Sequence, residues 1–434
     1  MNQLLDFTSF CDNVFALQNT GGKIMGKIKK AASLLLAVSM LFVGGSFSTN
    51  AATPITLVID GKTVQSDVAP IIQNSRTLVP LRVIMENLGA QVKWEASTGA
   101  IAIDTAAYHI SFTVNSQSYI VNGDKKTLDA APVVISDRTM IPIRALAESI
   151  GAEVNFDSAK NIVSVNYFTK GISGSISMSG SSALYPLANT AVDQFKAINP
   201  KVSANVAAGG SGTGLNNVLA GAVDIGNSDV YASEKLQASD ANKLIDHKVC
   251  LIGVSVIVNS DVGAAVKNLT KDQLKNIFNG TITNWKDVGG PNEAITIINR
   301  PSSSGTRALF VKWALDGQTD VEGDVSLQTD DSNALLTTVA NTKGTIGYLA
   351  LSYLVNSNAN ISKIQIDGVD ATYTNIYNNK YQVWGYEHMY TNGTPTGAVA
   401  MFLDYMTSSI VAAEAENMGY GAIMKLNDTA AKSR

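Results

Sequence analysis

The chain has 434 residues, of which 45% are hydrophobic and only 16% are charged, and it contains 35 glycines. This composition provides enough apolar surface for large buried cores and excludes a disordered, highly charged polypeptide. At roughly 100–200 residues per domain, the length indicates two to four domains. The formal net charge of −4 lacks the basic excess of nucleic-acid-binding proteins, so no nucleic-acid partner is expected.

The cysteines and histidines exclude several kinds of metal and redox site. Cys11 and Cys250 lie far apart and form no CxxC pattern, and the three histidines occur singly. We therefore expect no metal and no cofactor. Cys250 lies within an apolar run, which predicts an ordinary buried thiol.

Residues 25–52 have the three parts of a secretory signal peptide. Three lysines precede an apolar run over residues 31–43, and small and polar residues follow it. That run is shorter than the 20 or so residues of a membrane span. We expect cleavage after Ala51 or Ala52, and we interpret residues 1–24 as an upstream extension. No cysteine lies at the cleavage zone to carry a lipid anchor, so the mature chain is expected to be secreted or at the cell surface.

Residues 54–168 contain an internal repeat with an offset of 62 residues. The motif R-T-x-x-P-x-R begins at Arg76 and again at Arg138. A second motif, a glycine and an alanine followed by Val and an aromatic residue at alternate positions, begins at Gly89 and again at Gly151. Two copies of one unit are therefore expected, over about residues 54–106 and 116–168.

Within the first copy, the pattern predicts strands over residues 56–59 and 101–103 and a short helix over 81–88 that ends at a glycine. This α+β module resembles the copper amine oxidase N-terminal-like domain of secreted bacterial proteins. Its one histidine cannot assemble a copper site. We expect the repeated Arg82 and Arg144 to pair with a nearby carboxylate or carbonyl. The alternative for this region is the binding of a ligand such as cell-wall polymer.

After Tyr167 the composition changes, and residues 170–175 have the composition of a linker. Apolar strand-like runs then alternate with helical patterns, which indicates an α/β architecture. The predicted strands are 176–179, 202–207 and 251–258, and the predicted helices are 183–198 and 215–220.

Four predicted strand-to-helix junctions carry Gly together with Ser, Thr or Asp. They lie at residues 180–184, 209–215, 224–229 and 300–307. A helix N-terminus presents free N–H groups and a partial positive charge, so it favours an anion. Glycine allows close approach of the backbone, and hydroxyls add hydrogen-bond donors. Ser and Thr are also ordinary N-caps, but the repetition of the pattern, with an Arg at the head of the last junction, indicates an anion site.

Nucleotide-binding and hydrolase patterns do not fit these junctions. The glycines at 210, 212 and 214 lack the dinucleotide spacing, and the chain contains no GxxxxGK[ST] motif. No serine lies in a GxSxG elbow, and no SxxK motif occurs around the serine-rich loops. An extracellular phosphatase therefore lacks a visible nucleophile and base.

The motifs G-S-S-A-L, G-G-S-G-T-G, D-I-G-x-S-D and R-x-x-S-S-G-T-R occur in this order over residues 173–434. This segment resembles the phosphate-binding protein of bacterial phosphate-specific ABC transporters. The resemblance implies an α/β, two-lobed, periplasmic-binding-protein-like fold (type II) that closes over one phosphate. It also implies a transporter permease as partner and no enzymatic activity. We expect a first lobe of about 173–257 and 346–434 and a second lobe of about 258–345.

The same resemblance assigns a set of phosphate-binding residues to the first and second lobes. They are Ser181, Ser182, Ala183, Leu184, Ser211, Asp229, Arg300, Ser304, Gly305 and Thr306. Ser303 and Arg307 are further candidates, Arg307 through a supporting ion pair.

Asp229 has the most specific expected role. An ionised carboxylate accepts a hydrogen bond from protonated phosphate, whereas sulfate has no proton to donate and leaves an unpaired acceptor. The alternative role for Asp229 is an N-cap.

Other readings of the function stay open at this point. The chain could be a cell-surface interaction or phosphate-sensing protein that the N-terminal module anchors to envelope polymer. The ligand could also be another tetrahedral oxyanion.

Overall fold

A computed structural model describes residues 54–318, 320 and 326–434, and residues 54–434 form one compact unit. The predicted signal peptide and Cys11 lie outside the described residues. Within them, Cys250 is a buried free thiol, as expected.

The two repeat copies contain the same series of elements, each displaced by 62 residues. The first copy comprises β1 (Thr56–Ile59), β2 (Lys62–Val64), β3 (Ile71–Gln73), β4 (Arg76–Pro80), α2 (Leu81–Asn87), β5 (Gln91–Glu95) and β6 (Ala100–Asp104). The second comprises β8 (Ser118–Val121), β9 (Asp124–Thr127), β10 (Val133–Ile135), β11 (Arg138–Pro142), α3 (Ile143–Ser149), β12 (Glu153–Asp157) and β13 (Ile162–Asn166), and β7 (His109–Thr113) joins the two. The predicted strands and helix of the first copy are thus confirmed.

The copies are interlaced instead of forming two separate units. One sheet has the order β12-β13-β1-β2, a second β10-β11-β4-β3 and a third β5-β6-β7-β8-β9, so each contains strands of both copies. Two ion pairs at equivalent repeat positions, Arg76–Asp129 and Arg138–Asp67, also join one copy to the other. The expectation of two compact repeat units is therefore wrong, because the strands of each copy find their partners in the other copy.

The remainder of the chain is a mixed α/β structure around a 10-stranded sheet. Its first elements are β14 (Ser173–Gly180), α4 (Tyr185–Ile198), β15 (Lys201–Ala208), α5 (Ser211–Leu219), β16 (Ile225–Ser228), η2 (Ala232–Glu234), α6 (Ala238–Ala241), β17 (Leu244–Asn259) and α7 (Ser260–Gly263). Next come β18 (Asn268–Leu269), α8 (Lys271–Phe278), η3 (Trp285–Val288), β19 (Thr296–Asn299), α9 (Gly305–Ala314), β20 (Ser326–Gln328), α10 (Ser332–Asn341) and β21 (Thr345–Ala350). The last elements are η4 (Leu351–Tyr353), β22 (Ile361–Ile366), α11 (Tyr373–Tyr377), β23 (Trp384–Asn392), α12 (Gly397–Thr407), α13 (Ser409–Asn417), η5 (Ile423–Lys425) and α14 (Asp428–Ala431).

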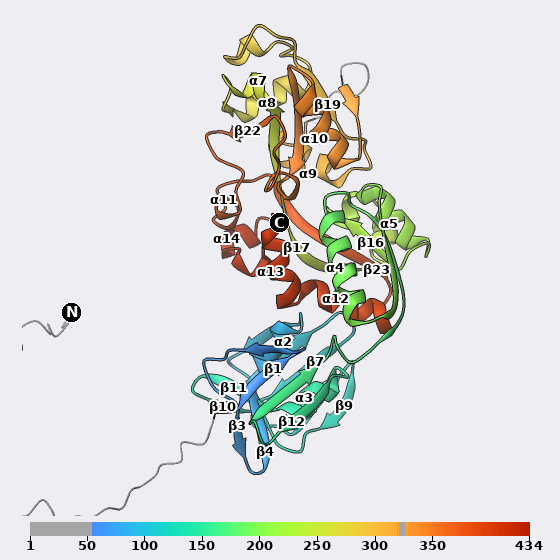
Figure 1. The fold of residues 1–434 in the computed structure, drawn as a ribbon, viewed down its shortest axis with the longest axis vertical. Helices are drawn as coiled ribbons and strands as arrows, with labels where there is room; N and C mark the ends of the chain where they lie inside the picture. Colours follow the sequence, from blue (N-terminus) through green and yellow to red (C-terminus); the bar gives the residue numbers. More distant parts are fainter. Residues whose placement is uncertain (1–53, 319, 321–325) are drawn as a thin grey trace, which may run out of the picture. The chain divides into compact units, whose positions relative to one another are not determined.

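Strand β17 belongs to both halves of this sheet. It pairs with β23 up to Gly253 and with β21 from Val254 onward. Figure 1 shows β17 running from the region of α4 and α5 toward the region of α7, α8 and α10. We call these two halves the first and second lobes. Strands β21 and β22 pair with the C-terminal part of β17, so residues 345–366 lie with the second-lobe strands, whereas the expected boundary put residues from 346 onward in the first lobe.

Local sequence explains how several helices begin. Helix α8 begins with a capping box, in which the Thr270 hydroxyl accepts from the Gln273 N–H and the Gln273 side chain accepts from the Thr270 N–H. Helix α5 follows Gly210, whose φ of +85° few other residues adopt. The predicted helix over 183–198 begins two residues later, at Tyr185, because a turn occupies residues 182–184.

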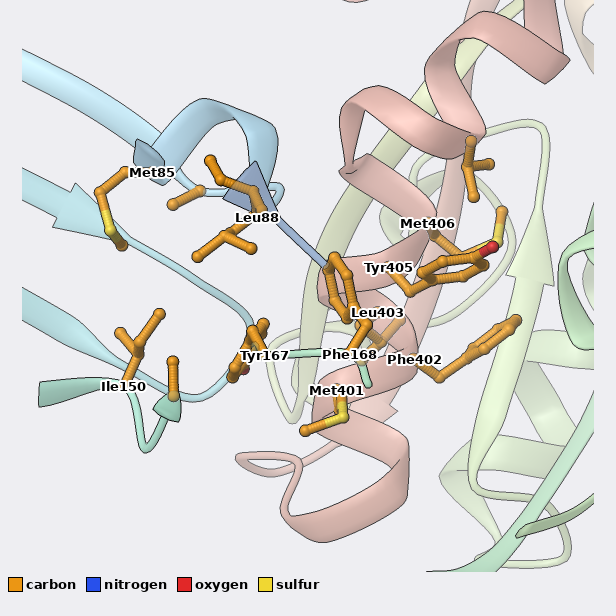
Figure 2. Close-up of a cluster of buried hydrophobic side chains, with 14 of the residues drawn as sticks. Met85, Leu88, Ile150, Tyr167, Phe168, Met401, Phe402, Leu403, Tyr405 and Met406 are labelled. Atoms are coloured by element: carbon orange, nitrogen blue, oxygen red, sulfur yellow. The ribbon is translucent and has the colours of Figure 1, made fainter. Parts of the chain in front are cut away.

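One hydrophobic core joins the repeat module to the first lobe. Figure 2 shows Tyr167 and Phe168 of the module beside Phe402 and Tyr405 of helix α12. The predicted linker is anchored on both sides, because Asn199 donates to the Phe168 carbonyl and accepts from the Ile172 N–H. The module is therefore packed on the first lobe and is not loosely tethered to it.

Helices α12 and α13 together have the length and composition of a membrane span but are bent by 56°. No single helix in the described ranges is long and apolar enough to cross a membrane.

Candidate functional site

The predicted junctions lie at the carboxyl ends of β14, β15, β16 and β19. Strand β14 lies between β15 and β16 and is parallel to both, so the loops that follow these strands lie at one edge of the first-lobe sheet. Ligands of open α/β sheets bind at this edge. The junction after β16 leads to a short 3₁₀ turn, η2, instead of the helix expected there. The ten predicted phosphate-binding residues and Arg307 are buried, whereas Ser303 is half-buried.

The first loop contributes mainly backbone groups. Ser181 Oγ accepts from the Leu184 N–H at 2.9 Å, so this hydroxyl caps the turn. Ala183 and Leu184 place their side chains in hydrophobic cores, which leaves only their backbone for polar contacts. Ser182 Oγ donates to the Asp330 carbonyl at 2.9 Å and so joins the two lobes.

Asp229 lies where the two lobes meet. Its N–H donates to Ser211 Oγ at 3.0 Å, and its Oδ2 accepts from the Thr306 hydroxyl at 2.7 Å. Oδ1 has no hydrogen-bond partner among the described residues, so the carboxylate does not act as a helix cap there. Gly305 is required at this point, because a Cβ there would lie 2.1 Å from Ser211 Oγ. The sequence thus brings a carboxylate, two hydroxyls and a helix start together.

Arg300 is the central cation of the site and is only 1% exposed. Its Nη2 donates to Ser332 Oγ at 2.7 Å, and its Nη1 lies 3.6 Å from Asp330 Oδ1. Nη1 also donates to Ser182 Oγ at 3.4 Å. Its Nε has no partner among the described residues, although it is buried. Arg300 thus reaches both lobes and keeps one buried donor.

Arg307 supports the arginine loop instead of facing the cluster. Its guanidinium forms a buried ion pair with Asp320 at 2.6 Å and donates to the Arg300 carbonyl at 3.0 Å. Ser304 caps the same helix, since its Oγ accepts from the Arg307 N–H at 3.3 Å. Ser303 contributes its carbonyl, which accepts from the Gly212 N–H at 2.9 Å.

Three residues that motif analysis missed also lie in the cluster: Lys235, Asp330 and Ser332. Lys235 Nζ of the first lobe donates to the carbonyls of Ser302 and Ser304 in the second, at 2.7 and 3.1 Å. Burial lowers the pKa of Lys235, and the nearby Asp229 opposes that change. Burial also raises the pKa of Asp330. For Asp330 and Ser332, the available sequence signal was the N-cap pattern at Asp331, which opens α10. Lys235 lies in no recognisable motif.

The comparisons with known proteins agree with this architecture. A family model described as the PBP superfamily domain matches residues 169–409, more than half of the chain. The phosphate-binding protein PstS of Bacillus subtilis is 47% identical over 254 residues, which are 58% of this chain and 80% of that protein. This chain belongs to the PstS family of the PBP superfamily.

Further PstS relatives and a solved structure extend the match. PstS of Borreliella burgdorferi is 26% identical over 56% of this chain and 88% of its own length. A putative phosphate ABC transporter substrate-binding protein from Clostridium perfringens, solved with bound phosphate, is 27% identical. It covers 58% of this chain and 100% of its own, with a TM-score of 0.51. The predicted resemblance and two-lobed fold are thus confirmed.

The module at the N-terminal side of the PstS-like part matches a second family model. This model is described as the copper amine oxidase N-terminal domain and covers residues 58–165, which confirms the predicted resemblance. Across the residues that the structure describes, no group of three or more His, Cys, Asp or Glu side chains is placed to hold a metal ion.

The module also carries an exposed groove of about 580 Å³ around Trp94. The groove is lined by Arg82, Val134 and Arg138 among others, and Trp94 is 42% exposed. Arg82 lies 3.8 Å from Glu86 on the same helix, a partner of the kind expected for it. The equivalent aromatic residue of the second copy, Phe156, is also exposed, at 45%. The two copies thus expose an aromatic ring at equivalent positions, and that of Trp94 lines the groove.

Proposed function

We propose that this chain is a non-enzymatic, extracellular solute-binding protein that captures inorganic phosphate between its two lobes for uptake through an ABC-transporter permease. One observation carries the proposal: Asp229, Arg300 and three helix starts converge in a buried cluster where the lobes meet. The similarity to PstS proteins, and to a transporter protein solved with phosphate, supports the same ligand.

The proposed phosphate ligands supply mostly neutral donors. They are Ser181, Ser182, Ala183, Leu184, Ser211, Asp229, Arg300, Ser304, Gly305 and Thr306. Backbone N–H groups at the starts of α4, α5 and α9 favour an anion. The unpaired Nε of Arg300 is a charged donor for a phosphate oxygen. Lys235 supplies a second positive charge nearby. These groups together bind an anion even in an acidic chain.

Asp229 is proposed to select phosphate over sulfate. Two carboxylate oxygens accept up to about four hydrogen bonds, and the Thr306 hydroxyl is the side-chain donor that Asp229 has within the described ranges. The carboxylate can therefore accept a further hydrogen bond, and protonated phosphate has a hydrogen to donate. Sulfate offers no hydrogen and would leave acceptor facing acceptor without water.

Isothermal titration of the mature chain with phosphate, and separately with sulfate, tests this proposal. We expect one phosphate per chain and at least about a hundredfold weaker binding of sulfate, since an unmatched buried acceptor costs a few kcal/mol. The proposal fails if phosphate gives no binding or if the two anions bind equally.

The same geometry argues against a phosphatase. Ser182 donates to a backbone carbonyl and Ser211 accepts from a backbone N–H, so neither hydroxyl is paired with a base. His388, the buried histidine, instead contacts Asp246 at 2.7 Å. Turnover of a chromogenic phosphate ester by the purified chain would contradict the non-enzymatic assignment.

A second function is proposed for the module: retention of the protein at the cell surface by binding a cell-wall glycan polymer. The observation that favours it is the groove with Trp94, Arg82 and Arg138, because aromatic faces and charged hydrogen-bond donors suit sugar rings and their polar substituents. We expect residues 25–52 to act as the signal peptide for export.

Sedimentation of the full mature chain with purified cell wall tests the retention function. We use the full chain because the module shares its core with the first lobe. Trp94→Ala should lower the bound fraction several-fold, while the matched control Met424→Ala, at a side chain 80% exposed on the PstS-like part, should leave it unchanged. Equal sedimentation of all three proteins would rule out a role for the groove.

A further inference from the structure

A second carboxyl group lies directly behind Asp229. Strands β16 and β23 are antiparallel, with Asn227 opposite Met389 and Ser228 opposite His388. Continuing this register by one residue places Asp229 opposite Glu387. Directly opposed residues of an antiparallel pair have Cβ atoms about 4.5–5.5 Å apart and point to the same face. On its other side, Glu387 is paired with Cys250 of β17.

No described cation forms an ion pair with Glu387 that would balance an ionised carboxylate. Its side chain is fully buried, and neither carboxyl oxygen has a hydrogen-bond partner among the described residues. The titratable groups that influence it are Asp229, Cys250, Tyr373 and Tyr420, which are acidic or neutral. Asp229 Oδ1 is likewise a buried acceptor without a partner among the described residues.

Two adjacent buried carboxyl groups cannot both be ionised at low cost. Like charges in a low-dielectric site repel strongly, so such a pair retains one proton that belongs to both groups. Burial raises the pKa of Glu387 well above its ordinary value, and the neighbouring Asp229 raises it further. The side chains of Glu387 and Asp229 also interact directly, and this interaction adds to the rise in the pKa of Glu387. A neutral Glu387 therefore has one O–H donor, and Asp229 has the acceptor for it.

We propose that Glu387 is a protonated positioning residue whose carboxylic acid donates to Asp229 and thereby fixes the charge and orientation of the carboxylate that recognises phosphate. The inference rests on the proposed function, because Asp229 is the phosphate contact. The side chains of Asp229 and Glu387 together then carry a single negative charge beside Arg300 and Lys235. A doubly charged pair would repel the incoming anion, and without Glu387 the Thr306 hydroxyl alone would hold the Asp229 carboxylate in place.

Infrared difference spectroscopy of the ligand-free chain at neutral pH tests the protonation state directly. We expect a protonated-carboxyl C=O band that shifts in D₂O and that is absent in Glu387→Gln. If wild type and Glu387→Gln have the same carboxyl-acid bands, Glu387 is ionised and the inference is wrong. This readout does not depend on phosphate binding.

Phosphate titration then tests the positioning role. Glu387→Met removes the donor at similar volume and should weaken phosphate binding at least about tenfold, as for loss of a hydrogen bond to a charged group. Glu387→Gln retains an N–H donor and should recover most of that loss. The matched control Tyr386→Phe changes the neighbouring residue of β23 and should bind as wild type does.

The outcomes separate this inference from the proposed function. A wild-type chain that binds no phosphate contradicts the proposed function, and the infrared band then decides the state of Glu387 by itself. A wild-type chain that binds phosphate, with Glu387→Met binding equally well, overturns the positioning role. Should Glu387→Met fail to fold, a Glu387→Gln variant that loses as much affinity as Ser211→Ala would also overturn it.

Discussion

Individual side-chain hydrogen bonds connect the two lobes at the anion site. Asp229 accepts from Thr306 across the lobe boundary, and Lys235 donates across it to the carbonyls of Ser302 and Ser304. Each contact places a polar group of one lobe against a loop of the other. Substitutions at this boundary should therefore change ligand binding more than they change folding.

Asp229→Asn should relax the discrimination between phosphate and sulfate. The amide of Asn offers both a donor and an acceptor, so it no longer penalises an anion without a hydrogen. We expect the ratio of sulfate to phosphate Kd to fall by at least about tenfold. Isothermal titration with both anions measures this ratio, and a general weakening of the site cancels from it. An unchanged ratio would assign the selectivity to another residue.

Gly305→Ala should weaken phosphate binding with little change in thermal stability. The new Cβ would lie 2.1 Å from Ser211 Oγ and 2.9 Å from Asp229 Cβ, so the lobes must separate. We expect at least about a tenfold rise in the phosphate Kd, equivalent to about 1.4 kcal/mol of displaced contacts. The control Gly209→Ala meets its nearest atom, the Thr213 methyl, at 3.5 Å. Equal affinities of the two variants would show that the lobes need not approach this closely.

At the scale of elements, helix α12 joins the repeat module to the first lobe. Asp404 of α12 accepts from the Ala106 N–H at 2.6 Å and from the Tyr167 hydroxyl at 2.7 Å. Thr407 donates to the Gly89 carbonyl at 2.8 Å. The contact thus combines an apolar core with two hydrogen bonds to the Asp404 carboxyl group and one from the Thr407 hydroxyl to the module backbone.

The repeat provides a matched pair of glycines for measuring this contact. Gly89 and Gly151 occupy equivalent positions, and both have positive φ, at +84° and +69°. A Cβ at Gly89 would lie 2.1 Å from the Asp404 carbonyl oxygen, whereas at Gly151 its nearest neighbour is Lys170 Nζ at 3.5 Å.

Both alanine substitutions place a side chain at a residue with positive φ and so strain the backbone, but only Gly89→Ala should disrupt the contact with α12. We expect Gly89→Ala to cost at least about 2 kcal/mol more than Gly151→Ala in unfolding free energy, measured by denaturant titration. Equal losses would mean that the module and α12 separate readily.

Asp404 should make stability depend on pH. Burial raises its pKa from 3.8 to about 6, so the folded chain binds this proton more tightly than the unfolded chain does. The associated stability is complete below about pH 4 and is lost as pH rises through about 6, by about 2–3 kcal/mol. Asp404→Asn cannot titrate, so its stability relative to wild type should increase from pH 4 to 6 and then level off. A difference that stays constant over this range would contradict the shift.

The sequence predicted many of these elements but not their partners. The offset of 62 residues marks every equivalent strand, yet the exchange of strands between copies depends on contacts that no local pattern encodes. The anion loops were predictable because Gly, Ser and Thr at helix starts form local motifs. Glu387 lies within a buried strand and becomes relevant only through the register of β16 and β23, which places it opposite Asp229 when continued by one residue. Asp330 similarly reaches Arg300 from a different loop.

At the scale of the whole molecule, the shared core couples the module to the ligand-binding part. The buried cluster runs from Leu57 of the module to Phe402 and Tyr405 of the first lobe. Contacts of this kind make neighbouring parts unfold together. The module should therefore respond to a ligand that it does not touch.

Phosphate should raise the unfolding temperature of the module as well as that of the lobes. At a hundredfold excess over Kd, a ligand stabilises its folded protein by about 2.7 kcal/mol. Trp94 lies in the module and Trp285, Trp313 and Trp384 lie in the lobes. The fluorescence difference between wild type and Trp94→Phe reports on the module. If the Trp94 transition stays fixed while the remaining signal shifts with phosphate, the two parts unfold independently.

The buried cluster of Asp229 and Arg300 should capture phosphate in the presence of competing sulfate, and competition dialysis measures this selectivity. The mature chain is dialysed against radiolabelled phosphate with a tenfold excess of sulfate, which sets the required selectivity at about 1.4 kcal/mol. We predict that one labelled phosphate per chain is retained and that Arg300→Ala retains at most about a tenth of it under the same conditions. Complete displacement of the label by sulfate, or equal retention by Arg300→Ala, would contradict the claim.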